Sequence, residues 1–246
     1  MKAFILASAL FSSFALAQTQ VLMIGTSHDD LGNTGNKTGV WLSELSHAYD
    51  HFSGSGVSIS FASIDGEGFP LDPGSLAEID DSAMDFLISE DKRNLLNGKN
   101  VLSLDEALGN KYDAVYLIGG HGVMWDFKGN QTLDLIIEKT YNSDGVIGAV
   151  CHGVAGLLTA TDSSGKLLIE DKKITGFSDE EEEAIQLSSV VPFSLEEDLK
   201  QANADYSQSD DNFSSYVVVD HRIVTGQNPA SAAEVAVEMV KVLESK

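Results

Sequence analysis

The sequence predicts an α/β fold: a doubly wound, mostly parallel sheet with helices on both faces. Short, continuous apolar runs such as Val21–Gly25 and Ala114–Ile118 have the composition of strands that are covered on both faces. Segments with a helical, 3.6-residue apolar period separate these runs. Alternation of buried strands with helices is typical of doubly wound sheets. The length of 246 residues suits one medium domain with a sizeable core.

The first half of the chain supplies two strands, several helical segments and one long loop. A strand is expected at Val21–Gly25 and a second, alternating strand at Val57–Ser63. Thr38 is expected to cap a helix that runs to about Phe52. The remaining segments of this half are a Gly-, Pro- and Asp-rich loop at Ile64–Leu76 and two helical pieces within Ala77–Leu108.

The second half repeats the alternation and ends in a hairpin and a helix. Ser178 with Glu181, and Ser231 with Glu234, are predicted capping boxes at the start of two helices. The predicted segments are strands at Ala114–Ile118, Val146–Val150 and near Ile174, helices at Gln131–Tyr141, Gly153–Thr161, from about Asp179 and from Ser231, and a hairpin at Tyr216–Val224 that turns at Asp220-His221.

The segment Met1–Ala17 has the layout of a secretory signal peptide. Lys2 is its positive end, Phe4–Leu16 is its apolar run, and Ala15-Leu16-Ala17 is a small-residue cleavage signal. The apolar run is short for a membrane anchor, which favours cleavage. We therefore expect an exported protein, periplasmic or secreted, with no membrane contact after cleavage. The mature chain, residues 18–246, is expected to form a single domain.

The charge of the chain excludes two classes of partner. The sequence holds 38 Asp and Glu against 15 Lys and Arg, a formal net charge of -23. Nucleic acids and anionic membranes are bound by clustered cations, so neither partner is expected. The one cysteine cannot form an internal disulfide and is too few for a Cys-based zinc or iron–sulfur site.

Three predicted strand ends carry unusual residues: Ser27-His28, Gly119-Gly120-His121 and Cys151-His152. Active sites of doubly wound sheets lie at the carboxyl ends of strands. Cys151 stands where a buried strand becomes a helix, between small residues that permit a tight turn, as in a nucleophile elbow. The positive end of that helix is expected to lower the pKa of the thiol. An inert core cysteine is the alternative, which the adjoining histidine and glycines disfavour.

Glu44 and the glycine pair are the other candidates for chemistry. Glu44 falls within an apolar stripe formed by Trp41, Leu45, Ala48 and Phe52. If its carboxyl faces the sheet, burial raises its pKa and suits it to proton transfer; at the edge of the stripe it would be solvated or ion-paired. Gly119-Gly120 offers backbone N–H groups to an oxyanion, although glycine pairs mostly make turns. No histidine spacing supports a metal site, so none is expected.

Six short segments, taken in order, carry a family signature: residues 37–44, 70–73, 119–122, 149–153, 174–177 and 225–231. Together they resemble the ThiJ/PfpI superfamily, within the class I glutamine amidotransferase-like, flavodoxin-like fold. The resemblance covers nearly all of the predicted mature chain. The motifs look most like the branch that holds glutathione-independent glyoxalase III enzymes and stress-inducible chaperone-like proteins.

The resemblance implies a role for each site residue. Cys151 would be the nucleophile, His152 would sit beside the thiol, and Glu44 would relay protons. Glu182 is the aligned candidate for the acid that orients His152, and a shift of one or two positions within the glutamate run 180–183 stays open. Gly120 and the backbone of His152 would form the oxyanion hole.

The implied activity is that of a glyoxalase III-like lyase of the D-lactate dehydratase type. Such an enzyme converts methylglyoxal-type 2-oxoaldehydes to 2-hydroxy acids without glutathione, metal or organic cofactor. The resemblance also implies a homodimer, and protein deglycation would use the same residues. A redox-sensing, holdase-type stress protein is the alternative, followed by a cysteine peptidase. Glutamine hydrolysis is not expected, because His221 precedes Arg222-Ile223 and not the His-x-Glu pair of class I glutaminases.

Overall fold

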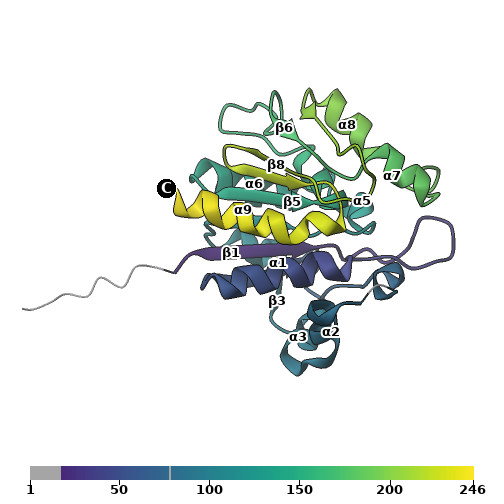
Figure 1. Cartoon of the computed structure of the whole chain (residues 1–246). Helices are drawn as coiled ribbons and strands as arrows, with labels where there is room; N and C mark the ends of the chain where they lie inside the picture. Colours follow the sequence, from purple (N-terminus) through teal and green to yellow (C-terminus); the bar gives the residue numbers. More distant parts are fainter. Residues whose placement is uncertain (1–17, 78) are drawn as a thin grey trace, which may run out of the picture.

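The computed structural model describes residues 18–77 and 79–246. The predicted signal peptide, Met1–Ala17, lies outside the described residues. The predicted domain, residues 18–246, is built around one central sheet (Figure 1).

The central sheet has seven strands in the order β3-β2-β1-β4-β5-β9-β8. Every neighbouring pair is parallel except β8 and β9, which form the predicted antiparallel hairpin. The strands of this sheet are β1 (Gln20–Gly25), β2 (Ser58–Ser63), β3 (Val101–Ser103), β4 (Ala114–Leu117), β5 (Val146–Val150), β8 (Val217–Asp220) and β9 (Ile223–Gly226). A separate parallel pair joins β6 (Lys173–Ile174) to β7 (Asp205–Tyr206). The predicted doubly wound, mostly parallel sheet is confirmed.

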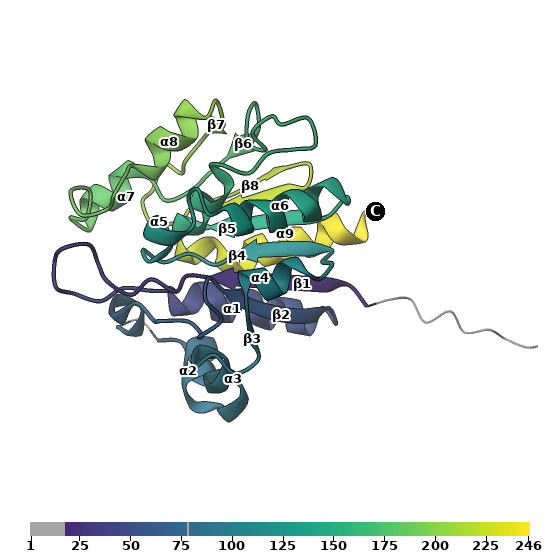
Figure 2. The same ribbon diagram turned by 180° about the vertical axis from the view of Figure 1, so that it is seen from behind.

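Helices cover both faces of the sheet, as predicted. Helices α1 and α9 pack side by side on one face (Figure 1), and α4 and α6 lie on the other (Figure 2). The α-helices are α1 (Leu42–Gly54), α2 (Asp81–Ile88), α3 (Glu90–Leu96), α4 (Leu104–Leu108), α5 (Val123–Asp126), α6 (Gln131–Asn142), α7 (Asp179–Ala184), α8 (Leu195–Gln201) and α9 (Ala232–Glu244). Short 3₁₀ helices are η1 (Pro73–Leu76), η2 (Cys151–Leu157) and η3 (Pro229–Ser231).

The core forms where the inner strands meet the helices. Residues 21–24 of β1, 114–117 of β4 and 146–150 of β5 are buried throughout, because both faces of these strands are covered. A glycine in β5 lets α9 approach closely: a Cβ at Gly148 would overlap the side chain of Met239. The buried strands thus supply a rigid base for the residues that follow their carboxyl ends.

The start of α1 differs from the prediction. Thr38 does not cap this helix; α1 begins at Leu42, after Trp41 in an extended conformation. Residues 38–41 are held extended because Val40 exchanges backbone hydrogen bonds with residues 70–72, at 2.7 and 2.9 Å. The Thr38 hydroxyl donates to Asp72 at 2.7 Å instead. A long-range pairing therefore overrides the local capping signal.

Other local predictions were wrong as well. The segment after Cys151 is the 3₁₀ helix η2, which ends at Leu157, and not a helix over Gly153–Thr161. Glycines disfavour the α-helix here, and Gly153 packs so tightly that a Cβ would lie 2.6 Å from the Leu117 carbonyl. Strands β3 and β7 and helices α5 and α8 were not predicted.

One of the two predicted capping boxes is confirmed. Ser178 and Glu181 cap α7 reciprocally. Ser231 makes no side-chain cap on α9, and its hydroxyl donates to the Tyr216 carbonyl. Glu234 accepts a hydrogen bond from Ser215 at 2.9 Å, so tertiary partners have replaced the second box.

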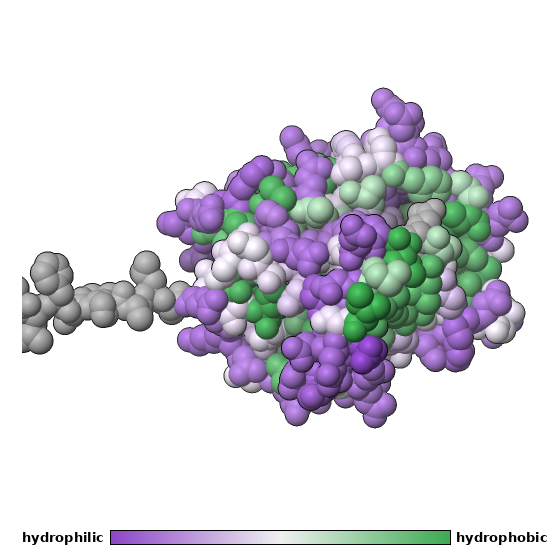
Figure 3. Space-filling model, turned by 60° about the horizontal axis from the view of Figure 1, so that its bottom comes forward, coloured by the Kyte–Doolittle hydropathy of each residue, from purple (hydrophilic) through white to green (hydrophobic). Residues whose placement is uncertain are grey.

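Two features of the described surface bear on partners. No helix within residues 18–77 and 79–246 has the length and apolarity that a bilayer crossing needs. Leu76, Met84 and Ile88, from η1 and α2, are 40%, 42% and 66% exposed. Figure 3 shows apolar side chains gathered on this side of the molecule.

Candidate active site

The predicted site residues meet at the carboxyl-end edge of the sheet. Cys151 directly follows β5, Gly120 follows β4, and Glu44 projects from α1. Glu182 comes from α7, which Figure 1 shows at the edge toward which β1 runs. Parallel strands all end at the same edge, so residues that are far apart in the sequence converge here.

Cys151 lies on a sharp turn. Its φ of 56° is left-handed, a conformation that costs a non-glycine residue about 1–2 kcal/mol. The turn moves the chain from β5 directly into η2, which is the geometry of the predicted elbow. The residue is only 3% exposed, so its sulfur sits in a nearly closed site.

His152 connects the thiol to a carboxylate. The Cys151 Sγ lies 3.2 Å from His152 Nδ1, and His152 Nε2 lies 2.8 Å from Glu182 Oε2. A hydrogen on Nε2 donates to the carboxylate and leaves Nδ1 free to accept the thiol proton. Burial and the neighbouring His121 lower the pKa of His152, and Glu182 raises it by less. The imidazole is therefore neutral. The structure places Glu182, and not its neighbours in the glutamate run, next to His152.

Glu182 is held as an anion. Burial opposes its ionisation, but hydrogen bonds from His121 and His152 outweigh burial and lower the pKa of Glu182 to about 2. A carboxylate that stays charged can orient an imidazole over the whole neutral range.

Glu44 is buried completely, so the solvated alternative is excluded. Its Oε2 accepts the Gly119 N–H at 2.9 Å, and its Oε1 is buried without a hydrogen bond of normal geometry in the described part of the chain. Burial raises the pKa of Glu44 to about 8, against hydrogen bonds with the Cys151 thiol and the Gly119 N–H. A carboxyl with this pKa can both take up and release a proton near neutral pH.

The environment of the thiol differs from the prediction. Burial and the charges of Glu44 and Glu181 raise the pKa of Cys151, and the His152 N–H only partly opposes them. The helix dipole expected to lower this pKa is weak, because η2 is a single short 3₁₀ segment. Below about pH 8 the resting site therefore holds a neutral thiol beside a neutral acid.

The two predicted oxyanion donors, the N–H groups of Gly120 and His152, follow β4 and β5 at the same edge of the sheet. The N–H of Gly120 donates to no described residue, and the N–H of His152 lies against Sγ. Gly120 has a φ of 100°, and a Cβ there would overlap the Gly39 carbonyl. Only glycine fits this backbone. The oxyanion role itself stays a prediction, as do the catalytic roles of the four side chains.

His121 belongs to the site although the sequence analysis gave it no role. Its Nε2 lies 3.0 Å from Glu182 Oε1, and its ring centroid lies 4.1 Å from that of His152. Its place directly after Gly119-Gly120 at a strand end was the signal that could have found it. His28 stacks on Trp125, and His221 is exposed at the hairpin turn.

One group of side chains has ligand atoms close enough together to bind a metal ion. The ligand atoms of His121, His152 and Glu182 all lie within 4.8 Å of one another, and this is the one such group in the described residues. Each oxygen of Glu182 is already hydrogen-bonded to an imidazole. The carboxylate is therefore satisfied without a cation.

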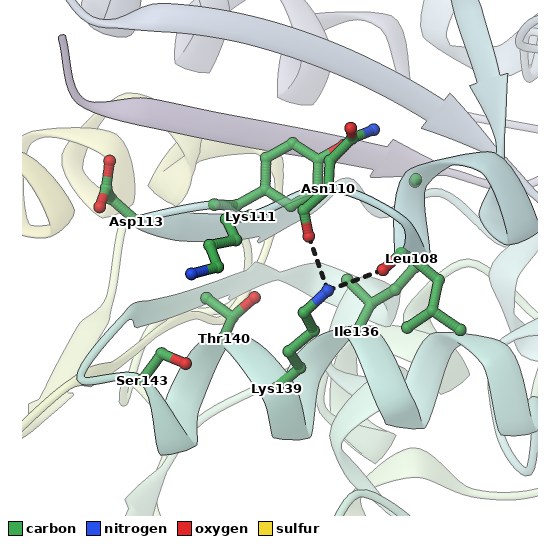
Figure 4. Close-up of a pocket in the computed structure, with 10 residues that line it drawn as sticks. Leu108, Asn110, Lys111, Asp113, Ile136, Lys139, Thr140 and Ser143 are labelled. Carbon is green, nitrogen blue, oxygen red and sulfur yellow. Dashed lines mark hydrogen bonds between the residues drawn. The ribbon is translucent and has the colours of Figure 1, made fainter. Parts of the chain in front are cut away.

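Two cavities differ in their relation to this site. Phe177, whose ring centroid is 4.4 Å from that of His152, and Glu182 both line a cavity of about 460 Å³. A second cavity of about 260 Å³ lies by Asp113, which precedes β4, so it adjoins the opposite edge of the sheet. Figure 4 shows Lys139 there, donating to the carbonyls of Leu108 and Asn110. The second cavity contains none of the predicted site residues.

The chain is similar over nearly its full length to two fungal proteins that are named glyoxalases. A glutathione-independent glyoxalase of Saccharomyces cerevisiae is 32% identical over 94% of this chain and 100% of its own. Glyoxalase 3 of Candida albicans is 31% identical over 92% of this chain and 98% of its own.

Solved structures agree with these relatives. The Rapid Encystment Protein 24 kDa of Francisella tularensis superposes with a TM-score of 0.85 at 41% identity, covering 92% of this chain and 99% of that one. Glyoxalase III from Candida albicans superposes with a TM-score of 0.83 at 28% identity, covering 93% and 98%. Residues 37–242 match the DJ-1/PfpI family, and the chain belongs to that family.

Proposed function

We propose that this chain is a glutathione-independent glyoxalase, a lyase of the D-lactate dehydratase type that acts on methylglyoxal-like 2-oxoaldehydes. One observation carries the proposal: Cys151 Sγ lies 3.2 Å from a buried, neutral His152 and beside the buried acid Glu44. The nucleophile, its base and a carboxyl suited to carbon-proton transfer therefore occupy one crevice. The glyoxalase relatives of nearly full length support the same activity.

The first step joins the sulfur to the substrate. As the Cys151 sulfur attacks the aldehyde carbon, the thiol proton passes to His152 Nδ1, and the C–S bond replaces the π bond of the carbonyl. The resulting oxyanion faces the N–H groups of Gly120 and His152, then takes the proton from His152 to give a hemithioacetal and a neutral imidazole. Because the thiol is neutral at rest, its proton leaves as the bond forms.

The second step moves hydrogen between the two substrate carbons. Ionised Glu44 removes the proton from the thiol-bearing carbon, and the proton of the new hydroxyl passes through His152 to the ketone oxygen, which gives an enediolate. Glu44 then delivers its proton to the neighbouring carbon, and the thiol-bearing carbon becomes a carbonyl. The product is a 2-hydroxyacyl thioester on Cys151. A pKa of about 8 suits Glu44 to both halves of the transfer.

The third step releases the product. Water attacks the thioester carbonyl as His152 takes one of its protons, the C–S bond breaks, and the departing sulfur receives that proton from His152. The sum is a 2-oxoaldehyde plus water giving a 2-hydroxy acid, so water is the co-reactant. Glu182 stays ionised throughout and holds His152 in one tautomer.

The test is formation of D-lactate from methylglyoxal by the purified protein without glutathione. Wild-type turnover should exceed that of Cys151→Ala by at least about 10³-fold, because removal of a nucleophile eliminates the covalent route. Cys151→Ser is the matched control, with nearly the same shape and a poorer nucleophile. Equal D-lactate formation by wild type and Cys151→Ala would rule the proposal out.

The alternative of a peroxide sensor or holdase receives less support. A sensor thiol is accessible and of low pKa, whereas Cys151 is 3% exposed and its pKa is raised by burial. We expect mild peroxide to leave Cys151 largely unmodified by intact mass. A selective gain of two oxygens on Cys151 would favour the sensor instead. Nothing described here identifies a peptide cleft for the peptidase alternative.

We also propose export and self-association. The signal-like segment Met1–Ala17 supports export, and a mature protein that begins at Gln18 would be the expected product. The exposed apolar side chains of Leu76, Met84 and Ile88 support a homodimer. Amino-terminal sequencing of the protein from its host tests the first proposal, and light scattering tests the second.

A further inference from the structure

Glu182 lies between two histidines, each on its own oxygen. His121 Nε2 is 3.0 Å from Oε1, and His152 Nε2 is 2.8 Å from Oε2. All three side chains are at most 8% exposed. Among the described residues, His121 is the hydrogen-bond partner of Oε1. The arrangement extends the line from Cys151 through His152 and Glu182 to a fourth side chain.

The charge of Glu182 determines which nitrogens of His121 and His152 carry a hydrogen. An ionised carboxylate only accepts hydrogen bonds, so each facing nitrogen must carry a hydrogen. His152 then has its hydrogen on Nε2 and a lone pair on Nδ1, toward Sγ. Without His121, Oε1 would be buried without a donor, and the carboxyl could rotate about its terminal bond. Rotation would remove the acceptor that selects this tautomer of His152.

The backbone that carries His121 is itself held in place. The preceding Gly119 donates its N–H to Glu44 at 2.9 Å. The following Gly122 donates its N–H to Gly39 at 3.3 Å, and a Cβ at Gly122 would lie 2.6 Å from the His28 carbonyl. One turn, residues 119–122, therefore contacts both acids of the site. Such a fixed segment can hold Glu182 in one orientation.

We infer that His121 is a positioning residue: its Nε2–H fixes the Glu182 carboxylate so that His152 presents an unprotonated Nδ1 to Cys151. The inference deepens the proposed function and rests on it for its kinetic consequence. It predicts that loss of His121 slows the chemical step and leaves substrate binding largely unchanged.

Two amide substitutions of His121 form a matched pair. The terminal nitrogen of Gln is as many bonds from Cβ as Nε2 of His, so His121→Gln keeps a donor toward Glu182. The nitrogen of Asn is one bond nearer to Cβ, so His121→Asn does not reach. We expect His121→Asn to lower kcat by about 10- to 100-fold with KM within about threefold, the size typical of a lost orienting partner. His121→Gln should recover most of this loss.

A readout that needs no turnover accompanies the kinetics. In ¹⁵N-histidine NMR spectra, His152 should be the Nε2–H tautomer in wild type and His121→Gln, and a mixture in His121→Asn. A double-mutant cycle adds a second variant: once Glu182→Gln is present, His121→Asn should cause little further loss.

Unchanged kcat and an unchanged His152 tautomer in His121→Asn would overturn the inference, as would full additivity in the double variant. Equal losses in His121→Gln and His121→Asn would also overturn it. If wild type makes no D-lactate, the proposed function fails, and the tautomer comparison still decides the role of His121.

Discussion

The site holds two buried carboxyls, Glu44 from α1 beside Cys151 and Glu182 from α7 behind His152, and their surroundings favour opposite charge states. Glu44 meets one backbone N–H and a thiol, and burial raises its pKa to about 8. Glu182 meets two imidazoles, which outweigh burial and lower its pKa to about 2. Each acid meets two donors, so the kind of donor decides the charge: the two imidazoles add a favourable electrostatic interaction that the thiol and the backbone N–H lack. One acid can therefore move protons while the other stays fixed as an anion.

Of the two acids, Glu44 should have the larger effect on activity when it is replaced by Gln. The variant keeps the shape but has no exchangeable carboxyl, so D-lactate formation should fall by about 10²- to 10⁴-fold. In wild type, kcat/KM should rise with pH up to about 8 as Glu44 ionises, and the variant should lack that rise. Steady-state kinetics from pH 5 to 9 measure both. Loss of activity with an unchanged pH rise would assign the rise to another group.

Glu44→Gln should also change how stability depends on pH. The folded pKa of Glu44 is raised from 4.5 to about 8, so the native state loses stability as pH rises through that window. The neutral amide lacks this loss. Between pH 5 and 9 the stability of the variant relative to wild type should improve by about 3–5 kcal/mol, at about 1.4 kcal/mol per pKa unit.

Urea unfolding at the two pH values measures this difference, and titrating groups that do not interact with Glu44 cancel in the comparison. A relative stability that is the same at pH 5 and pH 9 would mean that Glu44 is ionised in both.

Glu182→Gln should have a smaller effect on activity, about 10- to 100-fold, because the residue acts through His152. Its pH signature has the opposite sign. The folded pKa is lowered from 4.5 to about 2, so the stability that the carboxylate contributes is present above pH 4.5 and lost as pH falls toward 2. The deficit of the variant in urea unfolding should therefore shrink in acid. A deficit that grows in acid would reverse the proposed assignment of the two acids.

Lys139→Ala, at the opposite edge of the sheet, should have the smallest effect. Lys139 donates to the carbonyls of Leu108 and Asn110, both at 2.8 Å, so its loss should cost about 1 kcal/mol of stability. D-lactate formation should stay within about twofold of wild type. Lys111→Ala is the control, because Lys111 lines the same cavity. A large activity loss in either variant would mean that the two edges are coupled.

The fold class and the central strands of the sheet were predictable, because burial on both faces requires a continuous run of apolar residues. The runs around Val21–Gly25 and Ala114–Ile118 became β1 and β4. Local capping signals were less reliable. Thr38 and Ser231 have the right side chains, but long-range partners, Asp72 and Tyr216, take their hydroxyls.

The site was predictable in membership and less so in electrostatics. Cys151 and His152 follow a recognisable strand end. The apolar stripe on its helix included Glu44 but could not show whether the carboxyl is buried, which the structure shows. The pKa of Cys151 was wrongly predicted, because it depends on burial and on the charges of Glu44 and Glu181 that no local pattern encodes. The strand-end position of His121 was visible in the sequence, but its role was not, because its partner Glu182 is 61 residues away.

The opposite protonation of the two acids can be measured directly by NMR titration of the ¹³C-labelled glutamate carboxyls. Glu44→Gln and Glu182→Gln assign the two resonances by their absence. We expect the Glu44 carbon to report a titration near pH 8 and the Glu182 carboxyl to remain ionised down to about pH 2. A Glu44 carbon that titrates between pH 4 and 5, together with the exposed glutamates, would contradict this expectation.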